Sequence, residues 1–379
     1  MSLAWFIFVL IFCILGQAYI YQKWGLTNIH YTRSFSERAV FEGEQVEMID
    51  EISNKKILPV PWVRLDSKIN SHLQFTHSVN DDGEPELFHH TMFSLMPYQK
   101  VTRRHQISCE KRGYYRLNTV SISTGDAFGF GQDFQLFQAL TDITVYPTIS
   151  SIEDVPLPSH SWLGDIVVRR WIIEDPFFHA GVREYSYGDS MNNINWKATA
   201  RTNQLQVSKK DYTSDHHLMI YLNFDETEDI WLPIEDEELM ERGLSYAASV
   251  AQYAISKGIS TGFGCNSYLV EPFGQMGKVK DSVRISSKNN QNQLTFILDT
   301  MAKLKMDRSR NFNYFLQEDI ERTMSNTDIL LITSILTSKM KHQIRQLEAL
   351  GNSVEILWLQ KEGVSQETNG HEEGVLYGN

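Results

Sequence analysis

Five charged side chains that could bind or react with a partner lie within nineteen positions of one segment, residues 181–212. They are Arg183, Glu184, Asp189, Lys197 and Arg201. Tyr185, Gly188 and Trp196 lie between them, and WKATAR at 196–201 is predicted to form one or two turns of helix. Arginine forks bind carboxylates in a bidentate manner, and aromatic rings pack over guanidinium groups. The segment can therefore form a recognition or catalytic surface, or an ion-pair latch that fixes it against its domain. We favour the latch because the segment contains no nucleophile paired with a base.

The rest of the sequence offers no catalytic set. It contains no G-x-x-x-x-G-K-[ST], no G-x-G-x-x-G after a strand, no H-E-x-x-H and no G-x-S-x-G. Cys265 is predicted to be a small buried apolar residue and not a nucleophile. We expect a protein that is not an enzyme and that needs no cofactor. The 47 acidic against 35 basic residues give a net charge of −12, which opposes binding to nucleic acid.

The first residues predict a membrane anchor. Residues 3–21 contain no charge, and about 20 apolar residues span the ~30 Å hydrocarbon layer. A cleaved signal peptide fits less well, because no basic residue precedes the run and no small-residue cleavage site follows it. A buried N-terminal helix is the other alternative. We predict that residues 1–24 form a single transmembrane helix in the cell membrane. Lys23, Arg33 and Arg38 follow the span, which places the bulk of the chain in the cytoplasm.

Two folded regions are expected after the anchor. Short alternating apolar runs separated by turn residues predict an immunoglobulin-like β-sandwich over residues 30–146. The adjacent His89 and His90 lie on one of these strands and point to opposite faces, so they cannot bind one metal ion. Residues 147–180 carry four prolines and read as a linker. Strands alternate with amphipathic helices after this linker, beginning with an apolar strand at 217–224 and a helix at 235–258. The alternation predicts a Rossmann-like, parallel, doubly wound α/β domain over residues 213–360. Residues 361–379 form a polar tail.

The charged segment also carries a family resemblance. Its pattern R-E-Y-x-x-G-D-x-x-x-x-I-x-W-K-A-x-A-R resembles the signature of domain of unknown function 58, a bacterial and archaeal membrane-associated family with a von Willebrand factor A-like domain. The matching positions are Arg183, Glu184, Tyr185, Gly188, Asp189, Ile194, Trp196, Lys197, Ala198, Ala200 and Arg201. Upstream, R-G-Y-Y-R-L at 112–117 and G-D-A-F-G-F at 125–130 resemble the preceding β region of that family. The resemblance thus covers nearly the whole chain.

The resemblance also implies a position for a metal ion. In metal-adhesion domains the first strand of the α/β domain ends in D-x-S-x-S, and the corresponding residues here are Asp225, Thr227 and Asp229. The later strand lacks the second carboxylate, because Thr333 is followed by Ser334 and not by aspartate. Divalent cations need several oxygen ligands, so we expect no metal at this degenerate site.

These observations lead to one expected function and one alternative. We expect a non-enzymatic, membrane-anchored scaffold or adaptor that presents a protein-interaction surface. The resemblance implies work with a MoxR-type AAA+ ATPase in complex assembly or maturation, and association with a transglutaminase-like membrane protein. The alternative is a metal-dependent hydrolase that uses the acidic cluster at Asp225.

Overall fold

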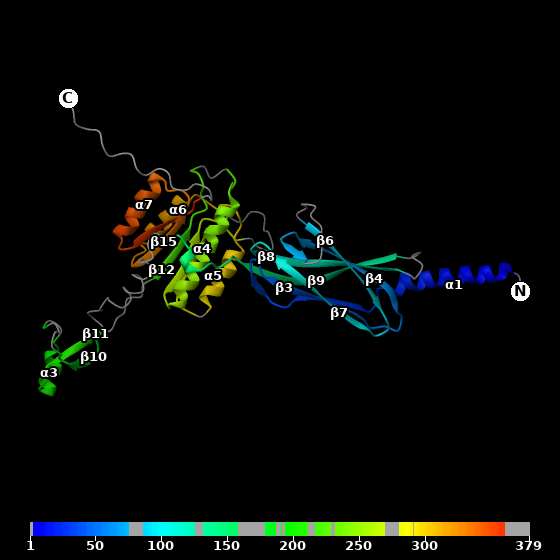
Figure 1. Cartoon of the computed structure of the whole chain (residues 1–379), viewed down its shortest axis with the longest axis horizontal. Coiled ribbons are helices and arrows are strands. Elements are labelled where there is room, and N and C mark those ends of the chain that lie inside the picture. The colour runs from blue at the N-terminus through cyan, green and yellow to red at the C-terminus, as the bar shows by residue number, and fades with distance from the viewer. Residues whose placement is uncertain are drawn as a thin grey trace, which may run out of the picture. The chain divides into compact units, whose positions relative to one another are not determined.

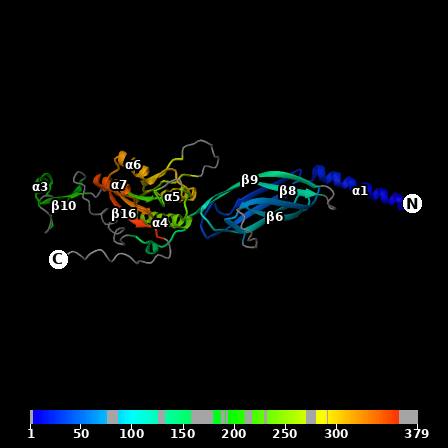
Figure 2. The ribbon, with the colours of Figure 1, turned by 90° about the horizontal axis from the view of Figure 1, so that it is seen from above.

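The computed structural model describes residues 3–75, 86–125, 132–157, 179–186, 191, 194–210, 217–228, 232–269, 280–290 and 292–360. The chain divides into two compact units (Figures 1 and 2). The first contains Met1–Thr148 with Met301–Lys303, and the second contains Ile149–Thr300 with Leu304–Asn379.

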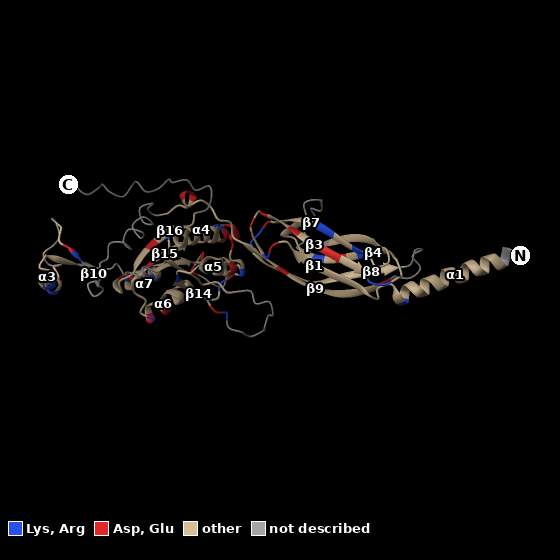
Figure 3. Ribbon diagram, turned by 90° about the horizontal axis from the view of Figure 1, so that it is seen from below, with Lys and Arg blue, Asp and Glu red and all other residues tan. Residues whose placement is uncertain are grey.

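The first unit begins with a single apolar helix, α1 (Leu3–Trp24). Residues 5–24 are long and apolar enough to cross a membrane, with a mean hydropathy of 1.8. Large apolar side chains such as Phe6 and Phe12 are exposed on the helix. Figure 3 shows α1 without charge except near its carboxyl end, where Lys23 lies in the last turn.

Two sheets follow the helix. One sheet has the strand order β1 (Ile29–Phe35), β3 (Gln45–Asn54), β7 (Lys100–Cys109) and β5 (Leu73–Phe75). The other has the order β2 (Ala39–Phe41), β9 (Gln132–Tyr146), β8 (Gly113–Gly125), β4 (Val60–Asn70) and β6 (Glu86–Leu95). Neighbouring strands pair antiparallel, except that β2 and β9 are parallel.

Apolar side chains of the two sheets pack against one another, which makes this part a β-sandwich. Alternate residues of β3 are buried, as the period of two along a strand requires. Met48 and Ile52 of β3 are fully buried and belong to two apolar clusters, to which both sheets contribute. The prediction of a β-sandwich is therefore confirmed, while its immunoglobulin-like subtype stays a prediction.

A buried ion pair lies inside the sandwich. Asp50 is fully buried, and its carboxylate accepts hydrogen bonds from Arg33 Nε at 2.7 Å and Arg33 Nη2 at 3.0 Å. The hydroxyl of Tyr31 donates to Asp50 Oδ1 at 2.7 Å. These three hydrogen bonds offset the free-energy cost of burying the carboxylate.

His89 and His90 face opposite sides of β6, as predicted. The His89 ring stacks on Phe75, with ring centroids 4.0 Å apart, and burial lowers the pKa of His89 to about 4. The exposed His90 instead contacts Asp66, with Nδ1 2.5 Å from Oδ1. Neither arrangement leaves the two rings free to share a metal ion.

The second unit is built on a five-stranded sheet. Its order is β14 (Val283–Lys288), β13 (Ser260–Cys265), β12 (His217–Leu222), β15 (Thr327–Thr333) and β16 (Ser353–Trp358). Four strands are parallel, as predicted. The edge strand β14 is antiparallel to β13 and corrects the prediction of a wholly parallel sheet. Four of its six residues are polar, so it gives little apolar signal in the sequence.

Helices cover both faces of this sheet (Figure 1). They are α4 (Glu237–Ser256), α5 (Gln293–Ala302), α6 (Phe312–Glu321) and α7 (Ser338–Ala349). Gly243 lets α4 approach Leu222, since a Cβ there would overlap the leucine side chain. On the other face, Tyr221 packs with Phe315 of α6 and Leu347 of α7. A short 3₁₀ turn, η1 (Ile152–Asp154), lies near the beginning of this unit, and Ser150 N–H donates to Ser249 Oγ on α4.

Candidate functional site

The charged segment forms a small β-hairpin with a helix in its connection. Strand β10 (His179–Glu184) pairs antiparallel with β11 (Gln206–Lys210), and α3 (Trp196–Thr202) lies between them. The predicted short helix is therefore confirmed. Asn195 caps it by accepting a hydrogen bond from Ala198 N–H at 3.0 Å, and Asn203 ends it in the left-handed conformation.

The hairpin has a small interior of its own. Ile194 and Val207 form an isolated β-bridge and are 7% and 4% exposed. Thr199 Oγ1 accepts a hydrogen bond from Gln206 N–H at 3.0 Å, which ties α3 to β11. These contacts hold α3 in a fixed position relative to the strand pair.

The predicted charged residues lie mainly on the outside of this hairpin. Arg183, Glu184, Lys197 and Arg201 are exposed, and Tyr185 is partly buried. Trp196 is 67% exposed. Gly188 and Asp189 lie outside the described residues, so the predicted latch role of Asp189 stays a prediction.

Apolar side chains of the same hairpin are exposed as well. Val182 of β10, Leu205 and Met191 are 48%, 43% and 68% exposed. Exposed apolar and aromatic residues interleaved with arginine and lysine are typical of interaction surfaces, where Trp and Arg are enriched. We call the exposed residues Val182, Arg183, Met191, Trp196, Lys197 and Arg201 the signature surface.

Asp225, the first residue of the degenerate metal motif, is a buried carboxylate at the carboxyl edge of the sheet. It is 1% exposed and follows β12. Its Oδ1 accepts a hydrogen bond from Asn266 Nδ2 and its Oδ2 accepts one from Phe312 N–H, both at 2.8 Å. Burial raises the pKa of Asp225 above its ordinary value, against the lowering effect of these two donors and of Arg308.

The other two residues of the degenerate metal motif are not seen to join Asp225. Thr227 is exposed and Asp229 lies outside the described residues. Among the residues that the structure describes, no group of three or more His, Cys, Asp or Glu side chains could hold a metal ion. Asp225 is held in place by N–H donors, which suits a residue that organises the loop after β12.

Several residues that complete this edge were not predicted. Asn223 donates through Nδ2 to Thr333 Oγ1 at 3.0 Å and accepts from Asp225 N–H at 2.9 Å. Asn266 follows β13 and also accepts a hydrogen bond from Phe224 N–H at 2.9 Å. Asn223 and Asn266 each come directly after a buried apolar strand. This position directly after a strand could have identified them from the sequence, because polar residues that follow parallel strands meet at one edge of the sheet.

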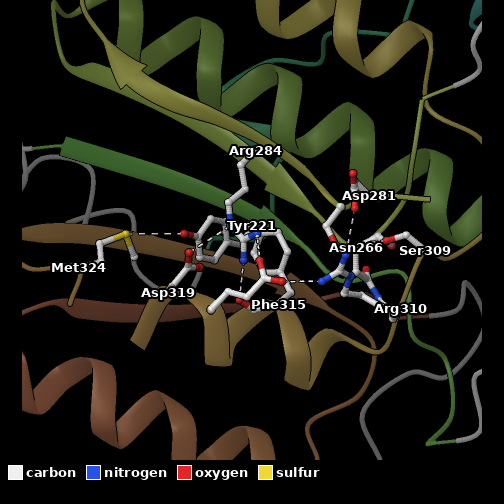
Figure 4. A network of polar contacts seen from close by, with 11 residues as sticks. Tyr221, Asn266, Asp281, Arg284, Ser309, Arg310, Phe315, Asp319 and Met324 are labelled. Carbon is white, nitrogen blue, oxygen red and sulfur yellow. Dashed lines mark hydrogen bonds and ion pairs between the residues drawn. The ribbon is translucent and has the colours of Figure 1, made fainter. Parts of the chain in front are cut away.

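A second polar network fastens β14 to α6 (Figure 4). Arg284 forms ion pairs with Glu318 at 2.6 Å and with Asp319 at 3.0 Å. Its guanidinium carbon lies 3.7 Å from the centre of the Phe315 ring. This network couples the edge strand β14 to the helix α6.

A cavity of about 440 Å³ lies along β14 and the beginning of α5. Its lining includes Arg284, Ser286, Lys288, Gln293 and Phe296. Lys288 pairs with Thr261, near the beginning of β13, whereas Asp225 follows the end of β12. The lining residues do not include Asp225 or the two residues that donate to it, Asn266 and Phe312.

One family model and several known proteins are similar to parts of this chain. An uncharacterised protein YeaD of Bacillus subtilis (strain 168) is 19% identical over 342 residues, covering 89% of this chain and 78% of that protein. Among solved structures, the CARDB domain of the PF1109 protein from Pyrococcus furiosus covers 31% of this chain and 93% of its own, at 13% identity and a TM-score of 0.19. A non-cellulosomal cohesin from Archaeoglobus fulgidus covers 30% of this chain and 90% of its own, at 11% identity and a TM-score of 0.22. Residues 181–273 match the family model described as "Protein of unknown function DUF58". The match includes most of the hairpin of β10, α3 and β11, together with β12 and α4.

Proposed function

We propose that this protein belongs to the DUF58 family and acts as a non-enzymatic scaffold that α1 anchors in the cell membrane. In this proposal the β-sandwich and the von Willebrand A-type α/β domain lie in the cytoplasm. The signature surface binds a protein partner, for which a MoxR-type AAA+ ATPase is the first candidate and a transglutaminase-like membrane protein the second.

One observation carries the proposal. The hairpin of β10, α3 and β11 has its own buried contacts, yet it leaves Trp196 67% exposed beside Lys197 and Arg201. Holding a tryptophan in water costs hydrophobic free energy that burial against a partner would recover. An exposed tryptophan next to cations is a common centre of protein–protein binding energy.

Anchoring gives the first testable prediction. Deleting residues 2–20 should move the protein from the membrane pellet to the soluble fraction, because it removes most of α1 and leaves Tyr21 in place. The control is the double change Phe6→Leu and Phe12→Leu, which keeps the helix apolar and should stay in the pellet. Membrane association of the deletion variant after a high-salt wash would contradict the anchor.

The signature surface gives the second prediction. In a pulldown with a MoxR-type AAA+ ATPase, Trp196→Ala and Lys197→Glu should weaken binding at least about tenfold, as expected for a central tryptophan and its neighbour. The urea midpoint should change little, since exposed substitutions usually alter stability by about 0.5 kcal/mol or less.

Trp358→Ala is the matched control for this experiment. Trp358 lies at the end of β16 and is 45% exposed, so its loss should affect neither binding nor stability strongly. If Trp196→Ala instead lowers the urea midpoint and leaves partner binding intact, the segment is the latch and not the docking surface.

A further inference from the structure

We propose that the end of the β-sandwich next to α1 is itself a membrane-binding surface, seated in the headgroup region of the bilayer. The surface consists of Trp24, Ile57, Met96 and Tyr98, and we call it the sandwich tip. The inference rests on the proposed membrane anchoring by α1 and adds a second, peripheral contact with the same lipid surface.

The connection between α1 and the sandwich is short and packed. Helix α1 ends at Trp24 and β1 begins at Ile29. Leu26, between them, is 5% exposed and belongs to the sandwich core. Gly25 N–H donates to Tyr21 O at 2.7 Å, and a Cβ on Gly25 would overlap that carbonyl. The helix therefore continues into the sandwich without a free linker.

A buried lysine fastens this connection. Lys56 follows β3, and its ammonium donates to Trp24 O at 2.5 Å and to Gly25 O. These carbonyls belong to the end of α1, where carbonyl groups lack partners within the helix and a cation is favoured. Burial lowers the pKa of Lys56 to about 8. Lys55 N–H also donates to Asn28 O at 3.0 Å.

The residues beside Lys56 and the neighbouring turn between β6 and β7 carry exposed apolar side chains. Ile57 is 78% exposed and comes directly after Lys56. Met96 and Tyr98, in the turn between β6 and β7, are 63% and 72% exposed. Tyr98 N–H donates to Lys56 O at 3.3 Å, so this turn lies beside the end of α1.

Tyr98 also adopts an unusual backbone conformation. Its φ is 55°, in the left-handed region that favours glycine or asparagine. A large aromatic side chain that is exposed at such a position contributes little buried apolar surface to the fold. Tyrosine and tryptophan are enriched where membrane proteins meet the bilayer interface, which gives the side chain a role.

The length of α1 sets the depth of the tip. Its 22 residues extend for ~33 Å, against a hydrocarbon thickness of ~30 Å. The end of α1 therefore falls at the level of the headgroups, and the tip is joined to it through Lys56. Exposed Lys23 and Lys55 add positive charge at the same level, where basic side chains are attracted to anionic lipid.

Lipid is a better occupant of this surface than a soluble protein. The tip is continuous with the apolar helix, and its tyrosine, tryptophan and lysines are the residue types that anchor membrane proteins at the interface. A soluble partner would have to reach the tip through the headgroup layer. We therefore assign the tip to the lipid surface.

The test uses the full chain reconstituted into vesicles of phosphatidylcholine and phosphatidylglycerol. Single cysteines replace Ile57 or Met96 in a Cys13→Ser background, and each is labelled with the fluorophore NBD. Cys109 and Cys265 are buried and should stay unlabelled. Glu110→Cys is the control, because Glu110 is exposed and lies between β7 and β8, beyond Cys109.

We expect blue-shifted emission and strong quenching by brominated lipids at positions 57 and 96, and neither effect at 110. Adding Tyr98→Asp should reduce the quenching at position 57, while the vesicles still carry the protein on flotation. Flotation without quenching at 57 and 96 would overturn the tip contact and leave the anchor intact. Failure to float with the vesicles would overturn both.

Discussion

Replacing Asp50 with alanine should lower the free energy of unfolding of the β-sandwich by about 3–5 kcal/mol, the usual cost of removing one partner of a buried ion pair. Asp50 is fully buried and Arg33 is 7% exposed. Without the carboxylate, the guanidinium and the Tyr31 hydroxyl lose the acceptor that they share. Since a domain is stable by only about 5–15 kcal/mol, this single change removes a large share of the total.

The measurement is chemical denaturation of the detergent-solubilised full chain, with hydrogen exchange followed on peptides from β1 and β3. Asp66→Ala is the matched control. Asp66 pairs with Arg64 at 2.8 Å, but the Arg64 side chain is 47% exposed. An exposed pair of this kind contributes about 0–1 kcal/mol, so Asp66→Ala should be nearly neutral.

A double variant tests the mechanism behind the loss. Arg33→Met combined with Asp50→Leu removes both charges and leaves no buried ion without a partner. It should be more stable than Asp50→Ala alone, because apolar replacement of a whole buried pair is often neutral or stabilising. An Asp50→Ala variant with the wild-type midpoint would show that the ion pair between β1 and β3 does not stabilise the sandwich.

The regular elements could be predicted because they carry periodic burial. The run at 217–224 contains β12, and the predicted helix at 235–258 contains α4. Both are long apolar patterns that local spacing makes visible. The antiparallel edge strand β14 escaped prediction, because four of its six residues are polar and its pairing depends on β13, distant in sequence.

The polar contacts could not be predicted in the same way. Arg33 and Asp50 are seventeen positions apart, and Asp225 and Phe312 are eighty-seven apart. Such pairs arise from strand order and loop closure, which one sequence does not specify. The local motif at 183–201 did predict the short helix α3, but its composition could not decide between a buried latch and an exposed surface. The exposure of Trp196 and Lys197 favours the surface.

The second large effect is expected at Asp225. Asp225→Ala should lower the free energy of unfolding of the α/β unit by about 2–6 kcal/mol, because two buried donors lose their acceptor at about 1–3 kcal/mol each. The donors are the Asn266 side-chain amide and the Phe312 N–H, which begins α6. Thermal denaturation and hydrogen exchange at the beginning of α6 measure this loss.

Glu228→Ala is the control in the same loop, and it should be nearly neutral because Glu228 is exposed. Asp225→Asn should fall between the two. Its amide oxygen can still accept one hydrogen bond, while its amide nitrogen meets a donor instead of an acceptor.

The same variants separate a structural carboxylate from a metal ligand. If Asp225 only organises the carboxyl edge, neither Mg²⁺ nor a chelator should shift the melting temperature of the wild type or of Asp225→Ala. A ligand that binds only the folded state raises stability by mass action. A Mg²⁺-dependent rise in the wild type that disappears in Asp225→Ala would therefore contradict the structural assignment. It would also favour the metal-dependent hydrolase. The bound ion would then have to displace the N–H donors that hold this carboxylate.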